Sequence, residues 1–212
     1  KALPPAQFAA LTMPLMPKVF NLIADKKSKA LCNASTRIVK DFAKAIDSRM
    51  VPVFVIGPLV VSGLSAEARW QTKVAALEAL AALAESAPRE IEAMMTQLVP
   101  VVSEAMWDTK RQVKEQALAC MEAICKTIEN IDLAPFIPEL IDTILAPEDT
   151  AECVYALAGT TFVQTVTASA LSITVPILGR GFQERKTAVQ RKCAVITENL
   201  AKLVKRAEDV VP

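Results

Sequence analysis

Apolar residues recur along most of the chain at spacings of three and four, which is the period of one face of an α-helix. The clearest series is Val113, Ala117, Cys120, Ile124 and Ile128. No alternation of apolar and polar residues persists as it would in a half-buried strand, and only five glycines occur. The pattern therefore predicts an all-α fold.

The predicted helices alternate between two kinds. A short apolar run around a proline forms each first helix, and a longer helical segment follows after a turn. These prolines, which recur about every 40 residues, are Pro17, Pro58, Pro100, Pro138 and Pro176. Aligning the second helices gives a similar period for Ala34, Ala76, Ala117, Tyr155 and Cys193. Because proline lacks a backbone N–H, we expect the first helices to be kinked.

The helix boundaries follow from this alternation. We predict first helices near residues 13–24, 51–64, 94–107, 136–145 and 169–181. We predict second helices near residues 29–46, 68–86, 110–129, 150–163 and 184–205. The fourth second helix has the weakest pattern, because its last residues, 159–163 (GTTFV), are poor helix formers.

Two-helix repeats of about 40 residues are typical of HEAT and armadillo arrays, in which each helix pair buries its apolar face on the next. We therefore predict a right-handed α-solenoid of about five HEAT repeats, each with two antiparallel helices. The chain is interpreted as a single domain, 1–212. Its predicted repeats lie near 13–47, 51–87, 94–130, 135–165 and 169–206.

Composition agrees with a large helical core, since 52% of the residues are hydrophobic and 22% are charged. The five cysteines include no Cys-x-x-Cys pair, and most lie on apolar faces. This usage favours reduced, buried thiols and a cytoplasmic protein over a disulfide framework. Charges or prolines interrupt every apolar run before the roughly 20 residues needed to span a bilayer, so no membrane partner is expected.

Several classes of enzyme lack the residues they would need. The chain contains no histidine, which excludes Ser-His-Asp triads, Cys-His pairs and histidine metal sites. No glycine-rich phosphate loop occurs. We interpret Gly179-Arg180-Gly181 as the end of a helix, with glycine in the left-handed conformation. The acidic residues Glu148, Asp149 and Glu152 are interpreted as a solvated helix start. No catalytic residue, metal, cofactor or small-molecule substrate is expected in this chain.

Charge is unevenly distributed, although the net charge is only +1. No lysine or arginine lies between Thr127 and Gly179, whereas the segment from Arg180 to Arg206 is strongly basic. Basic groups recur at the turn between the two helices of repeats one, three and five. The first group is Lys26, Lys27 and Lys29, and the candidate contact residues are Lys110, Arg111, Lys114, Arg180, Arg185, Lys186, Arg191 and Lys192.

Stacked repeats would bring equivalent turns onto one edge, so these groups predict a discontinuous basic edge that contacts phosphates. The alternative is that they are ordinary solvated helix faces. Beside one of these groups stand Trp107 and Asp108. We expect Trp107 to be buried against a neighbouring repeat and Asp108 to cap the following helix, so that both form a structural corner.

Three strings are unusual for a generic repeat: VSEAMWDTKRQVKEQA, APFIPELID, and LAGTTFVQTV with the later GRGFQERKTAVQRK. They resemble the amino-terminal HEAT region of the translation elongation factor 3 family. The members of this family are ribosome-associated ATPases with two ABC cassettes. The resemblance implies docking on ribosomal RNA and ribosomal proteins, and contact with other translation factors. It also implies that the cassettes, with their ATP and magnesium, lie further along the chain and promote release of tRNA from the exit site.

Two other interpretations remain open. A related stress-response activator of the kinase that senses uncharged tRNA carries a similar region. A HEAT-repeat adaptor, such as a transport adaptor, would instead hold a helix or peptide on its concave surface. Binding that is insensitive to salt would favour the adaptor, whereas binding that weakens as salt rises would favour a phosphate contact.

Overall fold

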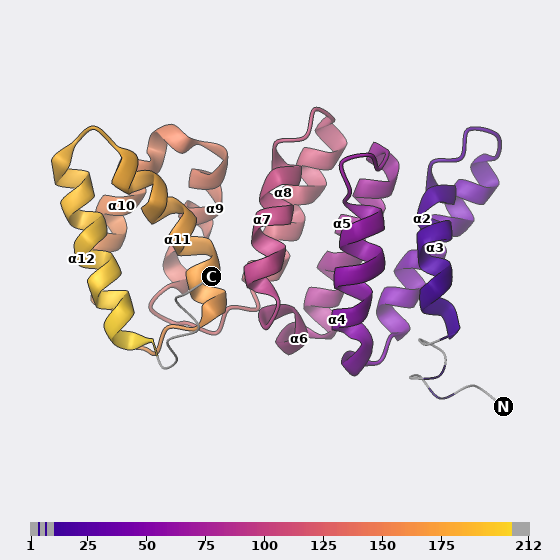
Figure 1. Cartoon of the computed structure of the whole chain (residues 1–212), viewed down its shortest axis with the longest axis horizontal. Helices are drawn as coiled ribbons and strands as arrows, with labels where there is room; N and C mark the ends of the chain where they lie inside the picture. The colour runs from indigo at the N-terminus through magenta and orange to yellow at the C-terminus, as the bar shows by residue number, and fades with distance from the viewer. Residues whose placement is uncertain (1–3, 5–6, 8–10, 205–212) are drawn as a thin grey trace. The chain divides into compact units, whose positions relative to one another are not determined.

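A computed structural model of the chain describes residues 4, 7 and 11–204, which are predominantly helical (Figure 1). Within these residues the only β-type pairing is an isolated bridge between Val166 and Val204. The all-α class predicted from the spacing of apolar residues is confirmed.

The chain forms two compact units. Unit 1 comprises Lys1–Met94 and Pro100–Thr127, and unit 2 comprises Met95–Val99 and Ile128–Pro212. The interpretation of residues 1–212 as a single domain stays a prediction.

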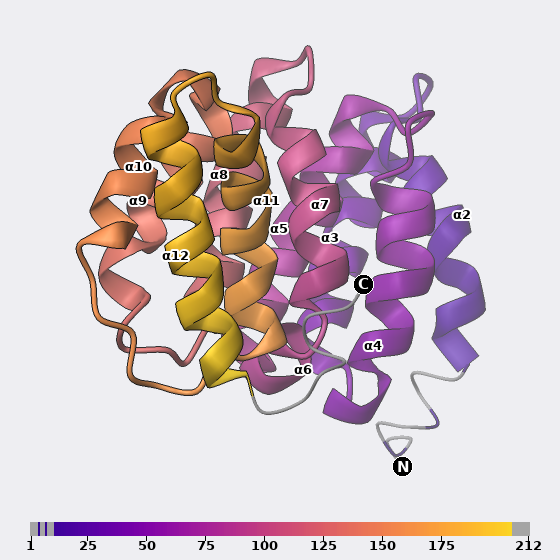
Figure 2. The same cartoon turned by 60° about the vertical axis from the view of Figure 1, so that its left-hand side comes forward.

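Unit 1 is built from helix pairs that lie side by side (Figures 1 and 2). Its α-helices are α2 (Met16–Ile23), α3 (Lys29–Ala45), α4 (Val51–Phe54), α5 (Trp70–Ser86), α6 (Pro88–Glu92), most of α7 (Met95–Met106) and α8 (Arg111–Cys125). Two short 3₁₀-helices, η1 (Met13–Leu15) and η2 (Ser48–Met50), precede α2 and α4. The segment η3 (Val55–Gly63) continues α4 as a π-helix.

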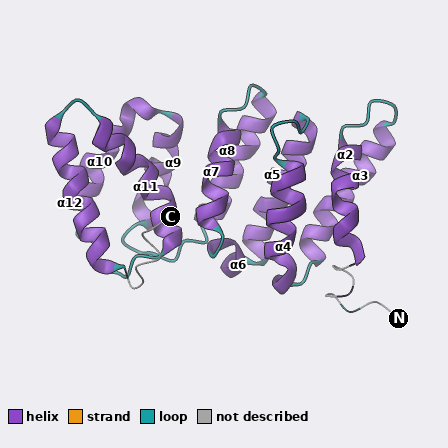
Figure 3. Cartoon of the chain, in the orientation of Figure 1, coloured by secondary structure: helices purple, strands orange, loops and turns teal. Residues whose placement is uncertain are grey.

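Unit 2 is also built from helices joined by short turns. Its elements are the 3₁₀-helix η4 (Ala134–Phe136), α9 (Ile137–Leu145), the 3₁₀-helix η5 (Pro147–Asp149), α10 (Thr150–Ala158), α11 (Ala168–Gln183) and α12 (Thr187–Leu203). Helix α10 ends before the string Gly159–Val163, and residues 159–167 form an irregular segment (Figure 3). The poor helix propensity of that string therefore shortens the predicted helix.

The prolines of the first helices occupy two kinds of place. Pro58, Pro100 and Pro176 lie inside η3, α7 and α11, whereas Pro17 and Pro138 lie in the first turn of α2 and α9. A proline in the first turn costs little, because its missing N–H has no partner within the helix. Inside a helix it removes a hydrogen bond, and the wider π-helical turns around Pro58 are a known accommodation of such irregularity.

The residues used to align the second helices do not all face the core. Ala76, Ala117 and Cys193 are fully buried, but Ala34 and Tyr155 are exposed. Their neighbours Ser35 and Val154 are buried instead. The alignment was therefore wrong by one residue in the first and fourth repeats, because the length of each turn sets which face of the following helix meets its neighbour.

The Gly179-Arg180-Gly181 string was also misinterpreted. It lies inside α11 rather than at its end, and no described residue has a positive φ. Gly181 is buried, and a Cβ placed there would lie only 2.5 Å from Cys193 Sγ on α12. Glycine is therefore required at this position by the close approach of two helices, not by a left-handed turn.

The thiols behave as the sequence predicts. Cys120, Cys125, Cys153 and Cys193 are buried and Cys32 is partly buried, and all five are free. Burial raises the pKa of Cys125 to about 12 and also raises the pKa of Cys120, so both remain protonated at neutral pH. Among the described helices, none is long and apolar enough to cross a bilayer alone. The pair Lys29–Ala45 and Ser48–Gly63 meets the length and composition limits only jointly, across a bend of 118°.

Candidate nucleic-acid interface

The turns between paired helices of unit 1 lie at one end of the unit (Figures 1 and 2). In the α2–α3 turn, the carboxylate of Asp25 accepts hydrogen bonds from the backbone N–H groups of Lys27 (2.6 Å) and Ser28 (3.1 Å). The Ser28 hydroxyl in turn caps α3 by accepting from the N–H of Leu31. These bonds fix the turn while the side chains of Lys26 and Lys27 remain exposed.

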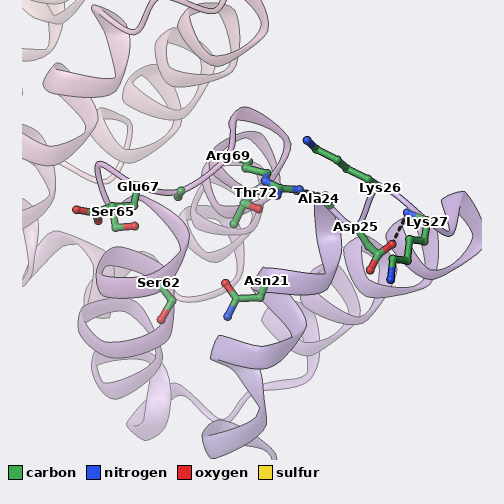
Figure 4. A pocket seen from close by; sticks show the side chains of 11 residues that line it. Asn21, Ala24, Asp25, Lys26, Lys27, Ser62, Ser65, Glu67, Arg69 and Thr72 are labelled. Atoms are coloured by element: carbon green, nitrogen blue, oxygen red, sulfur yellow. Dashed lines mark hydrogen bonds between the residues drawn. The ribbon is translucent and has the colours of Figure 1, made fainter.

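A polar cleft of about 480 Å³ lies between this turn and the η3–α5 turn (Figure 4). The Arg69 guanidinium donates to the carbonyl of Ala24, and the Thr72 hydroxyl donates to the carbonyl of Phe20 (3.1 Å), so both tie α5 to α2. The remaining side chains that line the cleft are Asn21, Asp25, Lys26, Lys27, Ser62, Ser65, Glu67 and Ala68. The cleft is therefore of mixed charge with a small excess of cations.

Trp107 is the residue at which the structure departs most from prediction. We expected it to be buried, but it is 54% exposed. Helix α7 ends at Met106, whose side chain is almost fully buried. Trp107 is the first residue after the helix, and its indole lies at the surface.

Asp108 is held by two donors from different elements. Lys73 on α5 approaches its Oδ2 at 2.8 Å, and the backbone N–H of Lys110 donates to its Oδ1 at 2.9 Å. We expected Asp108 to cap α8, but the residue before α8 is Lys110 and no side chain caps this helix, so that prediction is wrong. Asp108 instead holds the backbone just before the helix. Burial acts to raise the pKa of Asp108, but the hydrogen bonds from Lys73 and Lys110 outweigh it and lower the pKa below its ordinary value.

Replacing Asp108 with asparagine is expected to destabilise the protein by about 1–2 kcal/mol at pH 7, because it removes a charge-assisted bond and leaves Lys73 unpaired. A lowered native pKa contributes stability above the ordinary pKa of 3.8 and loses it as pH falls through the native value. The difference between wild type and variant should therefore shrink at about pH 3. Urea unfolding at both pH values, monitored by tryptophan fluorescence, measures the difference in free energy of unfolding between wild type and variant.

The exposed pair Arg111–Glu115 of unit 1 provides the control for this variant, since its atoms also approach closely, at 2.7 Å. Glu115→Gln should change the free energy of unfolding by no more than about 0.5 kcal/mol. An Asp108→Asn effect as small as this would contradict a structural role for Asp108.

The basic residues that follow this corner are all exposed. Lys110 immediately precedes α8, and Arg111 and Lys114 lie on its first turn. Arg111 contacts Glu115 at 2.7 Å, one turn further along, in an exposed ion pair that water weakens. Lys110 and Lys114 have no ion-pair partner among the described residues. Unit 1 thus brings the first and third predicted basic groups to the same end.

In unit 2 the basic candidates divide into two kinds. Arg185 and Lys186 in the α11–α12 turn, and Arg191 and Lys192 on α12, are exposed. Arg180 is half-buried on α11 and donates to the carbonyl of Thr143 on α9 at 2.9 Å. Burial lowers the pKa of Arg180. Its guanidinium therefore joins two helices of unit 2, a local role that the other four side chains do not have.

The acidic group at the start of α10 is solvated. Glu148, Asp149 and Glu152 are all exposed around the helix start, where carboxylates complement the helix dipole. Within residues 4, 7 and 11–204, no three potential metal ligands of the His, Cys, Asp or Glu type gather at one point.

Two family models match the sequence. The first, described as EF3 N-terminal HEAT repeat, matches residues 2–121, which is more than half of the chain. The chain belongs to the family of elongation factor 3 HEAT-repeat regions. A second model, described as Elongation factor 3/GNC1 HEAT repeat, matches residues 148–212. The resemblance inferred from the sequence strings is therefore confirmed.

Curated relatives extend over almost the whole chain. The sequence is 42% identical over 93% of its length to elongation factor 3 of Eremothecium gossypii. It is 40% identical over 89% to elongation factor 3B of Saccharomyces cerevisiae, and 36% identical over 92% to elongation factor 3 of Phytophthora infestans. The chain spans only 19% of the first relative and 18% of each of the others. The matched part of these relatives is thus the HEAT-repeat region alone.

Proposed function

We propose that this chain is a ribosome-docking module of an elongation factor 3-like ATPase. The observation that carries the proposal is the 42% identity to an elongation factor over 93% of the chain. The activity of the whole protein would support translation elongation and the release of tRNA from the exit site in the cytoplasm. ATP and magnesium would be bound by cassettes outside the matched HEAT region.

The chain would act as a passive scaffold. Exposed lysines and arginines on the turns would contact phosphates of ribosomal RNA and acidic segments of ribosomal proteins. Each cation that neutralises a phosphate releases a counterion, so this kind of binding weakens steeply as salt rises. In unit 1 the contacts would come from Lys110, Arg111 and Lys114. In unit 2 they would come from the exposed Arg185, Lys186, Arg191 and Lys192, and to a lesser extent from Arg180, which is half-buried and bonded to Thr143.

Co-sedimentation of the purified chain with purified ribosomes tests the proposal. Reversing the charge of Lys110, Arg111 and Lys114 together to glutamate is expected to weaken binding about tenfold, because phosphate contacts become repulsive. The slope of affinity against salt concentration should also become shallower, since fewer counterions are released.

A control triple carries the same change of charge at the opposite end of the helices of unit 1. Lys44 lies in the last turn of α3, Arg89 in α6 and Lys126 just after α8, and all three are exposed. Their joint replacement by glutamate should leave ribosome binding within about twofold of wild type. If both triples bind equally well, the basic edge is not the docking surface. Circular dichroism checks that both triples fold.

A further inference from the structure

The two tryptophans of the chain occupy neighbouring turns of unit 1. Trp70 begins α5 and is 37% exposed, and Trp107 follows α7 and is 54% exposed. Indole rings are usually well buried, because they contribute a large apolar area to a core. Within the part of the chain that the structure describes, neither indole has a ring contact or a hydrogen bond. Each indole therefore has exposed surface available to a partner, about a third of the residue for Trp70 and about half for Trp107.

An ion pair joins the two turns. Lys73 lies three residues after Trp70, a spacing that places both side chains on the same side of α5. Its ammonium group contacts the carboxylate of Asp108 at 2.8 Å, and Asp108 directly follows Trp107. The pair is largely shielded, since the side chains of Lys73 and Asp108 are only 18% and 13% exposed. It fixes the two tryptophan-bearing turns beside each other.

Cationic residues lie close to both tryptophans in the sequence. Arg69 precedes Trp70, and its guanidinium reaches the carbonyl of Ala24 at the rim of the cleft in Figure 4. Lys110 and Lys114 follow Trp107 without an ion-pair partner among the described residues. The acidic side chains of this edge are Asp108 and Glu115, which are paired with cations, and the exposed Glu67 and Glu104.

The chemistry of this edge fits single-stranded RNA better than an apolar helix of a partner protein. The residues beside each indole are polar: Arg69 and Gln71 flank Trp70, and Asp108 follows Trp107. An apolar partner would require a continuous apolar surface, which this sequence does not provide here. Aromatic faces interleaved with cations are instead the usual means by which proteins hold unpaired bases and their phosphates.

We propose that the turn edge formed by Arg69, Trp70, Trp107, Lys110 and Lys114 binds unpaired nucleotides of RNA. One base stacks on each indole, and the neighbouring phosphates contact the three cations. This proposal rests on the proposed ribosome docking and adds to it the kind of RNA that unit 1 contacts, namely single-stranded segments rather than duplex.

Binding of a fluorescently labelled oligouridylate of about ten nucleotides to the purified chain tests the proposal. Stacking should quench the tryptophan emission. Trp70→Ala and Trp107→Ala should each weaken binding at least about fivefold, because one stacked base contributes about 1–3 kcal/mol. Trp70→Phe and Trp107→Phe retain an aromatic face and should bind within about threefold of wild type. An RNA duplex of equal length should bind more weakly and quench less.

Equal affinity of wild type and both alanine variants for the oligonucleotide would overturn the stacking proposal, as would equal quenching by the duplex. Ribosome co-sedimentation of the same variants separates this result from failure of docking. If the alanine variants bind ribosomes more weakly but bind the oligonucleotide normally, the edge contacts a ribosomal protein and the RNA assignment is wrong. If no form of the chain sediments with ribosomes while stacking persists, docking fails and RNA stacking stands.

Discussion

Replacing Phe54 with alanine is expected to destabilise unit 1 by about 3–5 kcal/mol, the range for removing a fully buried aromatic ring. Phe54 ends α4 with no exposed surface. Its ring meets that of Phe42 on α3 edge to face, with centroids 4.9 Å apart and planes at 66°. The substitution removes this contact between the first two repeats and leaves a cavity that rigid helices fill only in part.

Tryptophan fluorescence measures this change selectively, because both tryptophans of the chain, Trp70 and Trp107, belong to unit 1. The urea midpoint of the fluorescence transition should fall markedly in the variant. Val53→Ala is the matched control, since this neighbouring residue is 54% exposed and its loss should cost no more than about 0.5 kcal/mol. Similar midpoints for the two variants would contradict the assignment of Phe54 to the core.

Helix positions could be predicted from the sequence because they depend on local signals. Residues 29–46 were predicted as a helix, and α3 spans Lys29–Ala45, where Ser28 caps its start. The short helix α6 was not predicted, since five residues give too few turns for a periodic pattern. The burial of Trp107 was wrongly predicted because a residue just after a helix can face either the core or solvent, and the local sequence does not decide between them.

In the candidate interface, too, local features could be predicted from the sequence and contacts between distant residues could not. Exposure of Lys110, Arg111 and Lys114 follows from their charge and from the apolar face opposite them, both of which are visible in the sequence. The position of the Arg69 side chain was not predicted, because it is set by a hydrogen bond to the carbonyl of Ala24, 45 residues away. Arg180 likewise bonds to Thr143, 37 residues away. Contacts between distant residues form only when helices are packed, so a single sequence gives no signal for them.

Gly181 and Gly179 allow the effect of an added methyl group to be compared at a packed and an open position, because they lie two residues apart in the same helix α11. A Cβ at position 181 would lie 2.5 Å from Cys193 Sγ and 3.2 Å from Val154 Cγ2, whereas a Cβ at position 179 would meet nothing within 4 Å. Gly181→Ala is expected to destabilise unit 2 by about 2–3 kcal/mol, since a well-packed core resists an added methyl group. Gly179→Ala should stabilise it by about 0.5–1 kcal/mol, since alanine is the better helix former.

Hydrogen exchange of the backbone amides of α11 and α12 measures both effects where they arise, and far-UV circular dichroism gives the unfolding midpoint. Gly181→Ala should exchange faster and Gly179→Ala should exchange at the same rate or more slowly. A double variant with Cys193→Ala isolates the cause, because removing the sulfur should recover part of the loss at Gly181. If Gly181→Ala stabilises unit 2 as Gly179→Ala does, helix propensity rather than close packing governs position 181. If Cys193→Ala recovers nothing, the obstruction comes from another neighbour, of which Val154 is the nearest.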